Sequence, residues 1–98
     1  MREINYNYRN DKNVQFIDVK FNTMKEIYNF IDDTRKFQSD IDLTSTVNHR
    51  YCVDAKSILG VLSLNVASIL KVGIISDDRN EINDFLETMK KYEYIAKD

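Results

Sequence analysis

The chain has 98 residues, enough for one domain, and its 14 lysines and arginines against 16 aspartates and glutamates leave a formal charge of −2. This balance argues against nucleic acid or an anionic membrane as a partner, because both require clustered positive charge. The single cysteine, Cys52, excludes an internal disulfide and a cysteine-based zinc site, and the single histidine, His49, excludes a multi-histidine site. With 43% hydrophobic residues the chain can build a core, so we expect one domain over residues 1–98 without metal or cofactor.

Residues 2–9 alternate between apolar and polar side chains, which predicts a half-buried strand. A second extended run covers Val14–Phe21, where the apolar phase changes. Either a bulge or burial on both faces explains the change. Thr23 then precedes a helical pattern, so we expect a helix over about 24–36.

Two alternating runs, Ile41–Val47 and Tyr51–Ala55, flank a polar turn at residues 48–50 and predict a β-hairpin. Ser57 follows in the N-cap position of a short, heavily buried helix. The most apolar stretch, residues 58–75, approaches the length of a membrane span. Polar residues and a change of period divide it, so we interpret it as that helix followed by a strand.

The strand is expected to begin at Leu70, and the last helix follows Asp78. Asp78 and Glu81 form an acidic variant of the capping box. The predicted order is β-(β)-α-β-β-α-β-α, an α+β fold in which the helices pack on one side of an antiparallel sheet. The polar N-terminus is unlike a secretory signal, so we expect a cytoplasmic protein without membrane insertion.

One segment resembles a known family. Lys56–Leu64 has the sequence K-S-I-L-G-V-L-S-L, which is similar to K-S-I-M-G-V-M-S-L of HPr, the histidine-containing phosphocarrier of the bacterial sugar phosphotransferase system. The resemblance continues from Lys36 to Lys90. It implies an open-faced sandwich with a four-stranded antiparallel sheet and three helices on one face. The strand expected over residues 2–9 has no counterpart in the family, and it either extends the first strand or adds a strand that covers the sheet edge.

The resemblance fails where HPr proteins carry G-I-H-A-R-P-A before the first helix. Thr23 stands in the position of the phosphoacceptor histidine, Lys25 in that of the arginine, and Glu26 replaces the proline. A phosphoryl relay needs a phosphoramidate, whereas a threonine ester is too stable and an unactivated hydroxyl is a poor nucleophile. We therefore expect no catalytic residue and no stand-alone enzyme activity. Thr23 and Lys25 form either a weak anion site or an ordinary helix start with a solvated lysine.

The resemblance also implies a regulatory role for Ser57, which matches a serine that a dedicated kinase phosphorylates in Gram-positive members. Lys56 would supply a neighbouring cation, and the alternative for Ser57 is a plain N-cap. Ile58, Leu59 and Leu62 correspond to the apolar patch that HPr presents to partners, and the alternative is that they belong to the core.

These features predict a regulatory or docking protein whose partners are proteins of the phosphotransferase or carbon-regulation system. Two alternatives stay open. One is a true phosphocarrier with a displaced acceptor such as His49, which we otherwise interpret as a polar hairpin residue. The other is a self-associating structural module that pairs through the N-terminal strand.

Overall fold

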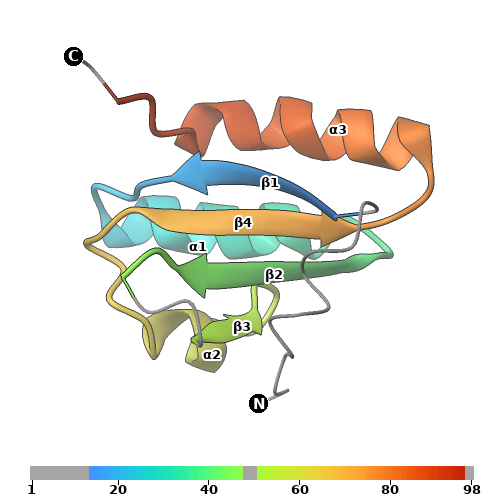
Figure 1. Ribbon diagram of the computed structural model, residues 1–98. Helices are drawn as coiled ribbons and strands as arrows, with labels where there is room; N and C mark the ends of the chain where they lie inside the picture. Colours follow the sequence, from blue (N-terminus) through green and yellow to red (C-terminus); the bar gives the residue numbers. More distant parts are fainter. Residues whose placement is uncertain (1–13, 48–50, 97–98) are drawn as a thin grey trace.

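Four strands and three α-helices make up most of the regular structure in residues 14–47 and 51–96, which the computed structural model describes (Figure 1). In chain order the elements are β1 (Val14–Val19), α1 (Met24–Thr34), β2 (Asp40–Ser45), β3 (Cys52–Asp54), α2 (Ile58–Leu62), β4 (Leu70–Ile75), α3 (Arg79–Met89) and the short 3₁₀ helix η2 (Lys90–Tyr92). The expected N-terminal strand over residues 2–9 and the hairpin turn with His49 lie outside the described residues.

The strands form one antiparallel sheet in the order β1-β4-β2-β3. Side chains at alternate positions of β4, such as Val72 and Ile74, are fully buried against the helices. Figure 1 shows α1 behind the central strands, with α3 beside β1 and α2 beside β3. The expected α+β sandwich with helices on one face of an antiparallel sheet is therefore confirmed.

The two apolar phases of β1 correspond to the two faces of one regular strand. Its register with β4 runs without interruption from Val14 to Val19, so no bulge is present there. Ile17 packs against the core, whereas Phe16 lies on the opposite face, over Gly73 of β4. A Cβ atom on Gly73 would come within 2.5 Å of the Phe16 ring, so the close approach of this ring requires glycine.

The expected helix over 24–36 is two residues shorter at its C-terminal end. α1 ends at Thr34, and Arg35 is its C-cap. The amides of Lys36 and Phe37 donate to Asp33 O and Thr34 O in tighter turns, at 3.3 and 3.2 Å. Phe37 packs edge-on against Phe85 of α3, with ring centroids 6.1 Å apart.

α3 begins at the expected cap, but the capping box is not closed. The Asp78 carboxylate accepts from the amides of Asn80 and Glu81, at 2.9 and 3.4 Å. Glu81 does not return the bond, because the Asp78 amide donates to Ser76 Oγ instead, at 3.0 Å. The Glu81 carboxylate instead accepts from the amides of Gln38 and Ser39 in the loop after α1. The predicted capping box is therefore wrong for the bond from the Asp78 amide to Glu81.

The apolar stretch over residues 58–75 divides into α2 and β4, as the change of period predicts. The expected heavy burial of α2 is wrong, because only Gly60 and Val61 of this helix are buried. Five residues form little more than one turn, so the remaining side chains face outward. Within the described residues, no helix is both long enough and apolar enough to cross a membrane.

Candidate docking and phosphorylation site

The entrance of α1 is built around Thr23, the N-cap. Its backbone is extended, and its hydroxyl oxygen accepts a hydrogen bond from the Glu26 amide at 3.1 Å. The Glu26 carboxylate reaches back to the amide of Asn22 at 2.8 Å. The pair acts like a capping box whose second bond is shifted by one residue. The pattern T-x-x-E over Thr23–Glu26 is the sequence signal of this arrangement, which was not among the predictions.

A hollow of about 200 Å³ lies beside the first turn of α1. We call it the α1 hollow; its lining residues are Phe21, Asn22, Thr23, Met24, Ile27, Val66 and Ala67. Phe21 and Ile27 are buried, whereas Met24 is 46% exposed and lies at the rim. Lys25 is exposed on the same turn. The hollow therefore joins the start of α1 to the loop after α2 and offers apolar contacts.

Ser57 caps α2, as the sequence predicts. Its Oγ atom accepts a hydrogen bond from the Gly60 amide at 3.2 Å. The ammonium group of the neighbouring Lys56 donates to Phe37 O at 2.5 Å. Arg35 Nε donates to Lys56 O at 3.0 Å. These two bonds tie the approach to α2 to the end of α1.

Ile58, Leu59 and Leu62 all face solvent, with exposed fractions of 37, 81 and 40%. We call these three side chains the α2 patch. The alternative that they belong to the core is therefore wrong. Exposed apolar side chains gathered on one short helix are typical of a surface that contacts another protein.

His49 and Cys52 are the single histidine and the single cysteine of the chain. His49 lies outside the described residues. Cys52 is buried on the sheet face opposite the helices, where Thr44 Oγ1 donates to its Sγ atom at 3.1 Å. In the part of the chain that the structure describes, no group of histidine, cysteine, aspartate and glutamate is arranged to hold a metal ion.

Sequence reasoning also missed a buried carboxylate, Asp33 on α1, which is only 6% exposed. Tyr92 Oη donates to its Oδ2 atom at 2.6 Å, Lys91 Nζ lies 2.9 Å from the same oxygen, and Lys36 Nζ lies 3.3 Å from Oδ1. Burial acts to raise the pKa of Asp33, but these donors outweigh it and hold the pKa below its usual value. No local pattern could show the pair, because Tyr92 is 59 positions away.

The pKa of Tyr92 is shifted in the opposite direction, above its usual value. Burial raises the pKa of its hydroxyl, and the hydrogen bond to the Asp33 carboxylate raises it further. The phenol therefore stays protonated and continues to donate to Asp33 well into the alkaline range. This pair connects α1 to the segment after α3.

The sheet order and the single layer of helices define an open-faced α+β sandwich. A family model described as "PTS HPr component phosphorylation site" matches residues 25–92. This match spans more than half of the chain, so the chain belongs to the HPr family of phosphocarrier proteins of the phosphotransferase system. The matched region begins at Lys25, two residues after Thr23. Among curated proteins, no match to the chain is found.

Proposed function

We propose that this protein is a regulatory or docking member of the HPr family that has lost phosphohistidine transfer. The observation that carries the proposal is Thr23 at the entrance of α1, where the resemblance expects the phosphoacceptor histidine. The Thr23 hydroxyl caps the helix, and a capping hydroxyl is an unactivated nucleophile. The protein would act in the cytoplasm by binding partners of the sugar-transport or carbon-regulation system, and not as an enzyme.

Two surfaces support a docking role. The α2 patch presents apolar side chains that need no rearrangement to reach a partner. The α1 hollow offers a recess for an apolar side chain of that partner. Apolar anchors that fill such recesses carry much of the binding energy in protein interfaces.

Labelling with enzyme I and radioactive phosphoenolpyruvate tests the loss of transfer. We expect the protein to remain unlabelled, while a histidine-bearing HPr in the same reaction takes up label. The Thr23→His variant shows whether the entrance of α1 regains an acceptor. Efficient labelling of the unaltered chain would overturn the proposal, and loss of that label in His49→Ala would identify a displaced acceptor.

We further propose that Ser57 is a site of regulatory phosphorylation. Its support is the resemblance of residues 56–64 to the kinase-recognised segment and the position of its hydroxyl at the start of α2. Incubation with the serine kinase of Gram-positive HPr proteins should add one phosphate, which mass spectrometry would map to Ser57. Ser63, whose hydroxyl donates to Gly60 O at 2.6 Å, supplies the matched control. Ser63→Ala should still accept phosphate and Ser57→Ala should not; a labelled Ser57→Ala would refute the assignment.

A further inference from the structure

The segment after α3 returns to the place where β1 leads into α1. The Lys20 amide donates to Tyr92 O at 3.1 Å, and the Tyr94 amide donates to Asp18 O at 2.8 Å. Figure 1 shows this segment beside the end of β1. We call residues 90–94 the C-terminal latch. Its backbone accepts a hydrogen bond from Lys20, the residue that immediately precedes Phe21.

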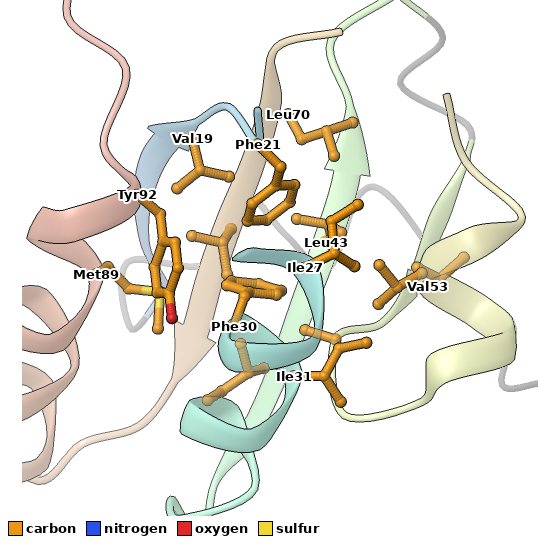
Figure 2. Close-up of a cluster of buried hydrophobic side chains, with 14 of the residues drawn as sticks. Val19, Phe21, Ile27, Phe30, Ile31, Leu43, Val53, Leu70, Met89 and Tyr92 are labelled. Carbon is orange, nitrogen blue, oxygen red and sulfur yellow. The ribbon is translucent and has the colours of Figure 1, made fainter. Parts of the chain in front are cut away.

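The side chain of Tyr92 fastens the same segment to α1. Figure 2 shows Tyr92 directed inward beside Phe21 and Phe30, and the ring centroids lie 5.9 and 5.5 Å from that of Tyr92. Its hydroxyl donates to the buried Asp33 carboxylate. Hydrogen bonds to a charged group are stronger than neutral ones, and a buried carboxylate that loses a donor is destabilised.

Phe21 links the latch to the site, because its ring contacts Tyr92 and the same residue lines the α1 hollow. Phe21 also stands two residues before the cap at Thr23. We propose that the C-terminal latch, closed by the Asp33–Tyr92 bond, holds the entrance of α1 and therefore the α1 hollow in one shape. Tyr92 is thus a positioning residue. The latch itself does not depend on the proposed docking function; only its consequence for docking does.

Amide hydrogen exchange of the full chain tests the latch. Tyr92→Phe keeps the ring and removes the hydroxyl. We expect the Glu26 and Ile27 amides, which close the first turn of α1, to exchange about fivefold faster or more, since one charged hydrogen bond is lost. Their exchange should be insensitive to low denaturant, which marks local opening and not global unfolding. Tyr28→Phe, at a tyrosine that is 46% exposed, is the matched control and should change nothing.

Asp33→Asn provides a second, independent variant. It removes the charge that strengthens the bond from Tyr92, so it should accelerate the same amides, and the effect of the double variant should be less than additive because both changes weaken one bond. A purely structural role predicts faster exchange in the central strand β4 with Glu26 and Ile27 unchanged, and that result would overturn the proposal. Exchange of Glu26 and Ile27 only through global unfolding would also overturn it. Neither outcome depends on whether a partner binds.

Discussion

Glu81 shows how one side chain can join three parts of the chain. Its carboxylate accepts from the Gln38 amide at 3.1 Å, from the amide and hydroxyl of Ser39, and from Ser76 Oγ at 2.7 Å. Burial acts to raise the pKa of Glu81, but these donors outweigh it and keep the pKa below its usual value. The loop after α1 is therefore held to α3 by an ionised group.

Replacing that group should destabilise the fold. Glu81→Gln removes the charge and two acceptor lone-pair sites, so we expect the free energy of unfolding at neutral pH to fall by about 1–3 kcal/mol. Urea unfolding measures the change. Glu87→Gln, on the same helix, is the control, because Glu87 is exposed and its ion pair with Lys90 contributes little. Equal effects of the two substitutions would show that the loop contacts of Glu81 do not matter.

At the scale of the element, α2 is more exposed than its apolar sequence predicts. Its buried residues, Gly60 and Val61, dock it on β3, and Gly60 approaches Val53 closely, where an added Cβ would lie 3.3 Å from Val53 Cβ. The remaining apolar side chains form the α2 patch. A helix this short cannot bury all its apolar residues, and this leaves a surface available for binding.

Leu59→Asp should therefore weaken docking without unfolding the protein. Leu59 is 81% exposed, so we expect a stability change within about 0.5 kcal/mol. Binding to enzyme I, measured by calorimetric titration, should weaken by about tenfold or more if Leu59 is an anchor. Ile95→Asp is the matched control, because Ile95 is 71% exposed but lies outside the patch. Unchanged binding by Leu59→Asp would contradict the docking role of α2.

At the scale of the whole molecule, three ionisable groups join segments that are distant along the chain, and their shifted pKa values predict how stability depends on pH. Asp33 and Glu81 have pKa values below their ordinary 3.8 and 4.5, so their stabilisation is present above those values and is lost as the pH falls through the lower folded-state pKa. Tyr92 has a pKa above its ordinary 10.0, so its stabilisation is present below pH 10.0 and is lost as the pH rises further.

The free energy of unfolding should therefore be flat between about pH 5 and pH 9 and should fall at both ends. Urea unfolding across the pH range measures this profile. Asp33→Asn should reduce the acid slope, and Tyr92→Phe should reduce the alkaline slope and cost about 1–3 kcal/mol at neutral pH. Tyr28→Phe should leave both slopes intact. An alkaline slope that persists unchanged in Tyr92→Phe would show that other groups cause it.

The elements were predictable to different degrees, for local reasons. Thr23, Ser57 and Asp78 are side chains that cap the amides two or three residues ahead, so their neighbours in sequence suffice to show the helix starts. The end of α1 at Thr34 has no comparable local signal, and beyond it Phe37 packs against Phe85 in a helix distant along the chain. The prediction that α2 is heavily buried was also wrong, because periodicity does not show how many turns a helix completes.

The sequence by itself determined the order of the described elements, their α+β class and the presence of threonine at position 23, where α1 is capped. These are properties of period, capping and residue identity, which act over a few positions. Only the tertiary structure decided that Glu81 holds the loop after α1, that Asp33 binds Tyr92 and that the α2 patch faces solvent. Contacts between distant positions form only when the layers pack together, so no local pattern contains them.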